Sequence, residues 1–100
     1  MADVSQPFVK DIRDRLRVKH TRHDKEITDL IGEARAELLS VGILASKVND
    51  EQDMLIRRAI FTYVKAEFGL DNDDSEKYRA SFEKQKIHIS NMAEYTVEEV

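Results

Sequence analysis

The residues best suited to metal chemistry are His20, His23 and Asp24, which form one His-x-x-His-Asp run. Imidazole and carboxylate groups bind zinc, but a structural zinc site needs a complete tetrahedral ligand set. The chain has no cysteine, and no second cluster completes such a set. We therefore predict no metal site and interpret both histidines as exposed loop residues. His88 is interpreted as a helix-surface or interface residue.

Pairs of carboxylates are the next candidates, because a carboxyl group with a perturbed pKa can act as a general acid or base. Glu33 and Glu37 are spaced one helical turn apart, and Asp73 and Asp74 are adjacent in an acidic turn. Nothing in the pattern predicts a dry pocket that would shift their pKa values. Neither a Gly-x-Ser-x-Gly elbow nor a glycine-rich phosphate loop is present. We predict that the chain is not an enzyme and holds no cofactor.

The elements that position these residues are predicted to be helices. Apolar residues recur at helical spacing, and the chain has only 3 glycines and 1 proline to interrupt them. One hundred residues suffice for one domain. We predict an all-α fold, a small bundle of about four helices over residues 1–91, followed by an extended tail, 92–100. No apolar run reaches the about 20 residues of a membrane span, and no secretion signal is evident, so we expect no membrane partner.

Capping residues and breakers set the predicted boundaries. Ser5 is a suitable N-cap, with Pro7 in the first turn, and glycines are typical just beyond a helix C-terminus. The predicted elements are a helix over 6–18, a helix from after Asp24 to Gly42, a packed loop over 41–48, a helix from after Asp50 to Gly69, and a helix over 74–91. In the third helix, Asp53 is expected at the reciprocal position of a capping box.

The third predicted helix is apolar on most sides, which is more than four short helices can cover. Either this helix is the hub of a compact bundle, or one of its flanks meets another subunit. We expect subunit contacts through it, with Phe61 as a candidate. Arg57 and Arg58 interrupt this apolar pattern. They are compatible either with an ion pair to a neighbouring subunit or with an exposed polar seam.

Charge is unevenly distributed along the chain. The net charge is −4, but residues 1–25 hold seven bases against four acids, a net of +3. The basic segment 10–25 allows an alternative function, a small helical DNA-binding regulator. Against it, no helix-turn-helix spacing is recognisable, and the second helix begins with acids that repel phosphate.

Three segments together resemble a known family. They are Asp24-x-x-Ile27-x-x-Leu30-Ile31-x-x-Ala34, the acid-capped helix from Asp50 to Val64 with its Phe68-Gly69 end, and Lys77 to Ser90 followed by Tyr95. Over most of residues 8–96 the chain resembles the small head–tail connector proteins of tailed bacteriophages, also called head-completion or adaptor proteins. Those of phages of Gram-positive bacteria are especially similar.

The resemblance implies a structural protein that assembles as a ring beneath the portal after DNA packaging. Such a ring, expected to be twelve-fold on the portal, extends the DNA channel, helps retain the genome and docks a stopper or tail-completion protein. The implied partners are the portal protein, that stopper and further copies of the chain, with DNA only as passing cargo. The implied location is the head–tail interface of the virion, and the host cytoplasm during assembly.

Two sets of residues follow as candidate sites. DNA must slide without sticking, so the channel lining should be acidic or mixed; Asp71, Asp73, Asp74 and the glutamates of the second helix are candidates. In the tail, Tyr95 and Val97 alternate with glutamates. This alternation suits either an extended segment that lies on a partner, with Tyr95 as its aromatic anchor, or a frayed end. From the partner-binding interpretation, deletion of 92–100 is expected to leave the melting temperature nearly unchanged and to abolish stable attachment to the portal or to the next tail component.

Overall fold

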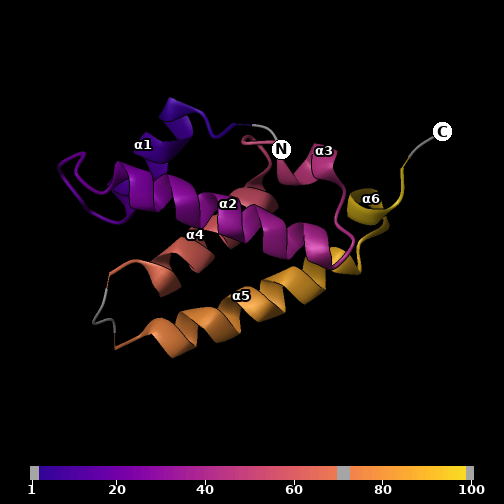
Figure 1. Cartoon of the computed structure of the whole chain (residues 1–100). Helices are drawn as coiled ribbons and strands as arrows, with labels where there is room; N and C mark the ends of the chain where they lie inside the picture. The colour runs from indigo at the N-terminus through magenta and orange to yellow at the C-terminus, as the bar shows by residue number, and fades with distance from the viewer. Residues whose placement is uncertain (1–2, 70–72, 99–100) are drawn as a thin grey trace.

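The computed structural model describes residues 3–69 and 73–98 of the chain. Within these residues it contains six helices and no strand (Figure 1), which confirms the predicted all-α class. The helices are α1 (Gln6–Arg15), α2 (Asp24–Ser40), α3 (Ala45–Val48), α4 (Met54–Glu67), α5 (Ser75–Ser90) and α6 (Ala93–Thr96). The four predicted helices correspond to α1, α2, α4 and α5. The prediction did not include α3 and α6, which are single turns.

The N-terminal helix begins as predicted and ends early. The Ser5 hydroxyl accepts a hydrogen bond from the Phe8 amide, which identifies Ser5 as the N-cap of α1. The helix stops at Arg15 rather than at Val18. Arg17 adopts a left-handed backbone conformation, with φ of 63°. A residue in that conformation cannot continue a right-handed helix.

Two aspartates have different roles from those predicted. Asp24 is the first residue of α2 rather than its cap, and its carboxylate accepts a 2.6 Å hydrogen bond from Arg13 instead. The cap of α4 is Asp53, not Asp50: the Asp53 carboxylate accepts from the amides of Leu55 and Ile56. The third long helix therefore begins three residues later than predicted, because Asp53 satisfies its free N–H groups.

Glycines end two helices as predicted. Gly42 follows the C-cap of α2 with φ of 92°, and Gly69 follows that of α4 with φ of 85°. Glycine adopts this left-handed conformation without the clash that a Cβ atom causes. The segment predicted as a packed loop over 41–48 instead contains α3, whose Val48 is fully buried beside Ile43 in the core.

The C-terminal segment is not extended throughout, which corrects the prediction for residues 92–100. Residues Ala93–Thr96 form α6, and Tyr95 is 8% exposed. The Tyr95 carbonyl accepts a 2.8 Å hydrogen bond from the Leu44 amide, so α6 is attached to the start of α3. Sequence pattern alone missed this because one turn of helix stabilised by tertiary contacts has little periodicity of its own.

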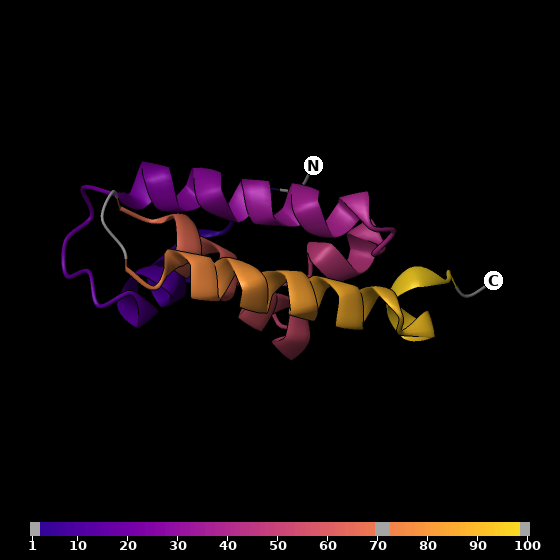
Figure 2. The ribbon, with the colours of Figure 1, turned by 90° about the horizontal axis from the view of Figure 1, so that it is seen from below.

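The long helices form an elongated body of 44 × 28 × 18 Å in which α4 is central. In Figure 1, α4 passes between α2 and α5, and these are its main packing partners. The view from below in Figure 2 shows α2 and α5 running along the length of the molecule, with α1 at one end and α6 at the other. The core contains apolar residues from every helix, α4 contributing Ile56, Ala59, Ile60 and Val64.

A buried ionic network connects distant parts of the chain. Arg35 on α2 is 1% exposed, and its guanidinium donates a 3.1 Å hydrogen bond to Glu51. Glu51 also accepts hydrogen bonds from the backbone amide and hydroxyl of Ser5. Its burial raises the pKa of Glu51, but the Ser5 hydrogen bonds and the Arg35 charge outweigh this, and the pKa lies below its ordinary value. The network holds the start of α1 against α2 and the α3–α4 turn.

Candidate functional site

A groove between α4 and α5 brings together the predicted interface residues Arg57, Arg58 and Phe61. Its volume is about 560 Å³. Met54 at the start of α4 is 74% exposed beside it. The Phe61 ring lies 5.8 Å below the guanidinium of Arg15 from α1. The apolar excess predicted for this helix is therefore partly directed outward, into this groove.

The groove is electropositive, although the whole chain is acidic. Its lining includes three arginines and no carboxylate. Arg57 and Arg15 both pair with Asp11, at 2.5 and 3.4 Å, so one carboxylate is shared between two guanidinium groups. Arg58 is exposed and makes no ion pair within the part of the chain that the structure describes. The local excess of positive charge suits an acidic partner.

The groove also contains polar atoms without partners. The Gln85 amide oxygen and the Arg57 Nε atom are buried and make no hydrogen bond. Buried polar atoms are nearly always paired in native proteins. Sequence reasoning missed the α1 and α5 contributions, because Arg15, Tyr78, Ser81 and Gln85 meet α4 only through tertiary packing.

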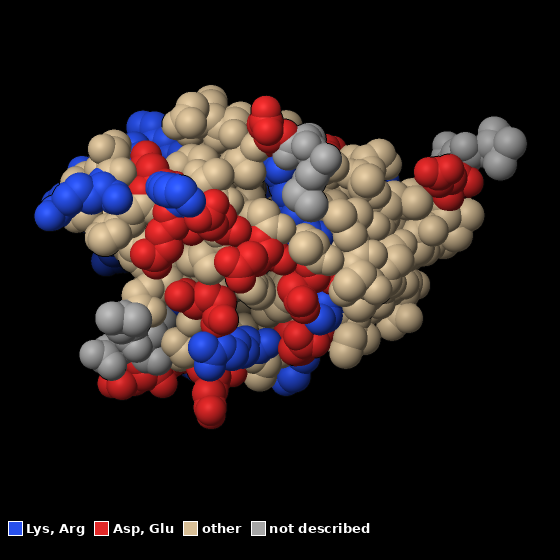
Figure 3. All heavy atoms as spheres, in the orientation of Figure 1, with Lys and Arg blue, Asp and Glu red and all other residues tan. Residues whose placement is uncertain are grey.

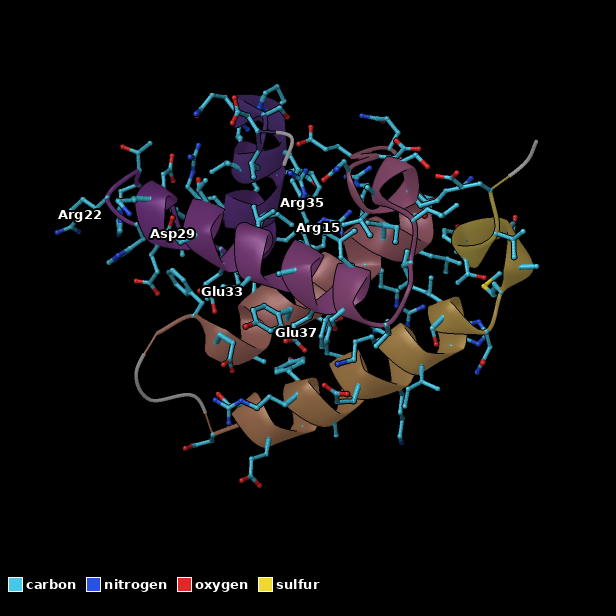
Figure 4. The ribbon with its side chains drawn as sticks, turned by 45° about the vertical axis from the view of Figure 1, so that its right-hand side comes forward. Arg15, Arg22, Asp29, Glu33, Arg35 and Glu37 are labelled. Atoms are coloured by element: carbon cyan, nitrogen blue, oxygen red, sulfur yellow. The ribbon has the colours of Figure 1, made fainter. Side chains whose placement is uncertain are left out.

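Acidic residues gather on another face of the molecule. Figure 3 shows them across α2 and the region between α2 and α5, and Figure 4 shows Glu33 and Glu37 on the side of α2 away from Arg35. Glu37 lines a cavity of about 270 Å³ together with Tyr63, Phe82 and other residues. Burial, together with a 3.1 Å hydrogen bond to Glu33, raises the pKa of Tyr63 to about 12.

Lysine and arginine side chains partly neutralise this acidic face. Lys86 donates hydrogen bonds to Glu37 and Glu83, at 3.1 and 3.0 Å. Burial lowers the pKa of Lys86, but these two carboxylates outweigh it and raise the pKa above its ordinary value. The carboxylates of α2 and these cations together form a mixed surface with a negative balance.

The predicted acidic turn is described only in part. Asp71 lies outside the described residues, whereas Asp73 and Asp74 are exposed just before α5. The start of α5, which directly follows Asp74, is at the same end of the molecule as the α1–α2 loop (Figure 1). Their assignment to a channel lining stays a prediction.

At the opposite end, Tyr95 and Val97 have different environments. The Tyr95 hydroxyl donates to both carboxylate oxygens of Asp53, at 2.9 and 3.1 Å. Burial and this carboxylate raise the pKa of Tyr95 to about 12. Val97, the residue that follows α6, is 62% exposed, and Glu94 and Glu98 near it are exposed as well. Tyr95 therefore attaches the segment to the body, and Val97 is the apolar side chain that it presents outward.

The basic segment 10–25 is largely paired within the chain. Lys10, Arg13, Arg15 and Lys25 each pair with an aspartate. Arg17, Lys19 and Arg22 make no ion pair with any described residue and lie in or next to the α1–α2 loop, from which Arg22 projects in Figure 4.

The histidines of this loop make ring contacts. The ring centroids of His20 and His23 are 5.3 Å apart, and His23 meets Phe68 edge-on at 5.6 Å.

Among the described residues, no group of three or more potential ligands could hold a metal ion. None of the described helices is long and apolar enough to cross a bilayer.

The buried pair of Arg35 and Glu51 was also missed by sequence reasoning, although a signal exists. Arg35 follows Ile31 by four residues and precedes Leu38 by three, so it lies on the apolar stripe of α2. A charged residue in such a stripe indicates a buried ion pair or a functional site. Here it is a structural pair, described above.

These features define an all-helical protein whose charged and apolar surfaces suit contact with other macromolecules. Residues 8–96 match the family described as phage connector protein. The match spans most of the chain, and the chain belongs to the phage connector protein family. This confirms the resemblance found in the sequence and supports a head–tail connector role at the head–tail interface of the virion. Membership of a structural family also indicates a non-enzymatic role. Comparisons with curated proteins and with solved structures gave no significant match.

Proposed function

We propose that the protein is a head-completion connector that forms a ring beneath the portal, extends the DNA channel and docks the stopper or tail. The observation that carries this proposal is the family match over residues 8–96. The electropositive groove with its partly exposed apolar side chains agrees with it, because arginine, methionine and aromatic residues are enriched in protein interfaces. A small chain without disulfides also benefits from assembly.

The portal protein of the same phage provides the direct test. Mixing it with the connector at near-physiological salt is expected to give a stoichiometric complex with a central hole in electron micrographs. Repetition of a weak contact around a preformed ring makes the sum strong, so the portal should promote assembly of otherwise monomeric protein. Folded connector that fails to bind this portal would contradict the proposal.

The channel lining is proposed to be acidic, from Asp71, Asp73, Asp74 and the glutamates of α2. A lining of this sign repels the phosphate backbone and lets DNA pass. Replacing the three aspartates with lysine is expected to slow or trap DNA during ejection from completed heads. Asp14→Lys, an exposed reversal on α1, is the control. If the triple variant ejects DNA at the wild-type rate, these three aspartates do not line the channel.

The proposed contact residues are Arg57, Arg58, Phe61 and Val97, with Tyr95 holding α6 in place from within the fold. The C-terminal segment 92–100 is proposed to take part in attachment. Replacing Val97 with Ser removes an exposed apolar side chain and is expected to reduce head completion while the melting temperature stays unchanged. Thr21→Ala, at an exposed position of the α1–α2 loop, is the control. Heads completed at the wild-type level by the Val97 variant would exclude this segment from attachment.

A further inference from the structure

The α4–α5 groove has the character of a docking site that the isolated chain leaves open. Apolar atoms of Met54, Leu55 and Phe61 lie beside three arginines in its lining. Methionine, arginine and aromatic residues are the types enriched in the cores of protein interfaces. The absence of any carboxylate from its lining makes the groove selective for an acidic segment.

The chain itself carries a segment of matching chemistry. After α6, Val97 is exposed and is flanked by Glu94 and Glu98, with no base among residues 94–98. Val97 and Glu98 border a hollow beside Ser46 and Lys47 of α3, at the end of the molecule that α6 occupies in Figure 2. The hydrogen bonds of Tyr95 to Asp53 and to Leu44 fix where this segment leaves the fold.

We propose that the α4–α5 groove receives the C-terminal segment of a second copy of this chain, with Val97 against Phe61 and Met54 and Glu98 against Arg58. The contact joins two different surfaces of the same protein, so it is heterologous, and repetition of a heterologous contact closes a ring when the rotation permits. The inference rests on the proposed ring and assigns its subunit contact.

Cysteine cross-linking tests this contact directly, because the chain has no cysteine of its own. Ser81→Cys lies in the groove on α5, and Val97→Cys lies in the exposed segment. A mixture of the two single variants, bound to portal or concentrated without it, is expected to give a cross-linked heterodimer with a short bismaleimide. A chain carrying both substitutions is expected to give a ladder of oligomers. Ser40→Cys on α2, outside the groove, is the matched control for Ser81→Cys.

Three results would overturn the proposal. Equal coupling of Val97→Cys to Ser40→Cys would mean that the contact is not specific for the groove. A doubly substituted chain that yields only an internally cross-linked monomer would mean that the segment docks on its own groove. Absence of Ser81–Val97 coupling both on the portal and in concentrated protein would exclude the contact. Portal binding is read from the same mixtures before cross-linking, so a failed contact is distinguished from a failed connector function.

Charge reversal gives a second, independent readout. Arg58→Glu and Glu98→Arg are each expected to reduce the cross-linking yield about two- to fivefold, the range of an exposed ion pair. The double variant, which restores opposite charges across the contact, is expected to recover the wild-type yield. Single reversals without effect, or a double variant as weak as either single one, would contradict the pairing of Glu98 with Arg58.

Discussion

Glu51 is the residue that most directly couples separate parts of the fold. It pairs with a buried guanidinium on α2 and accepts two hydrogen bonds from Ser5 at the start of α1. Breaking one side of a buried ion pair leaves the other charge uncompensated, which costs far more than the loss of an exposed pair. Single substitutions in this network should therefore affect the stability of the whole chain.

Glu51→Gln is expected to lower the free energy of unfolding by about 2–3 kcal/mol at neutral pH. The folded-state pKa of Glu51 lies below the ordinary value of 4.5, so its stabilisation is present above pH 4.5 and is lost as the pH falls through the lowered pKa. Urea unfolding followed by circular dichroism at several pH values measures both effects. Asp29→Asn, which breaks an exposed pair with Lys25, is the control and should change little. A difference between wild type and Glu51→Gln that persists unchanged at low pH would contradict this assignment.

The Tyr95 hydroxyl gives a prediction at alkaline pH. Tyr95→Phe is expected to cost about 1 kcal/mol, since it removes the hydrogen bonds to the Asp53 cap. The folded-state pKa of about 12 exceeds the ordinary value of 10, so the hydroxyl contributes stability below pH 10 that is lost as the pH rises towards 12. The difference in unfolding free energy between wild type and Tyr95→Phe should therefore shrink above pH 10. A constant difference across that range would mean that the hydroxyl does not bond to Asp53.

At the scale of elements, α6 changes the interpretation of the C-terminal segment. It is a single turn, too short to be stable alone. Tyr95 nevertheless joins the core, and its hydroxyl donates a hydrogen bond to Asp53, the N-cap residue of α4. The segment therefore has two parts. Residues 93–96 belong to the fold, and Val97 and Glu98 are exposed.

Deletion of residues 93–100 is accordingly expected to destabilise the protein, which reverses the expectation from sequence. Loss of a buried aromatic side chain costs about 3 kcal/mol, which lowers the melting temperature of a chain of this size by roughly 10–20 °C. Differential scanning calorimetry measures the change. Val97→Ser in the full chain is the comparison, and its melting temperature should equal that of the wild type. A deletion variant that also melts with the wild type would mean that α6 does not pack on the body in solution.

At the scale of the whole molecule, charge is divided between surfaces. The α4–α5 groove is electropositive and the α2 face is acidic, within a chain of net charge −4. Three bases in or next to the α1–α2 loop make no ion pair with any described residue. A molecule with complementary surfaces in different places is suited to repeated contact with its own kind. The same distribution argues against avid DNA binding, because most bases of segment 10–25 are already paired.

Free protein is therefore expected not to shift DNA in a gel at physiological salt. Any binding at low salt should depend on Arg17, Lys19 and Arg22, so the slope of log affinity against log salt should not exceed about 3. Replacing these three residues with Gln should abolish that residual binding. Micromolar binding with a steeper slope would instead favour the DNA-binding regulator.

Local signals in the sequence determined the all-α class, the cap at Ser5, the glycine ends of two helices and the excess apolar surface of α4. These depend on periodicity and on the backbone preferences of single residues, which act over a few positions. The connector family was also recognisable from its helix pattern. Because Arg57, Arg58 and Phe61 are close along one helix, their common location could be predicted as well.

Only the tertiary structure decided which residues from distant segments meet. Arg35 meets Glu51 across 16 positions, and Tyr95 reaches the Asp53 carboxylate across 42 positions. The chain offers several carboxylates that could accept from Arg35 or from the Tyr95 hydroxyl. Chain packing decides which of them is near enough and buried enough to do so. For the same reason, α6 could not be predicted: a single turn acquires its stability from long-range contacts that its own sequence does not encode.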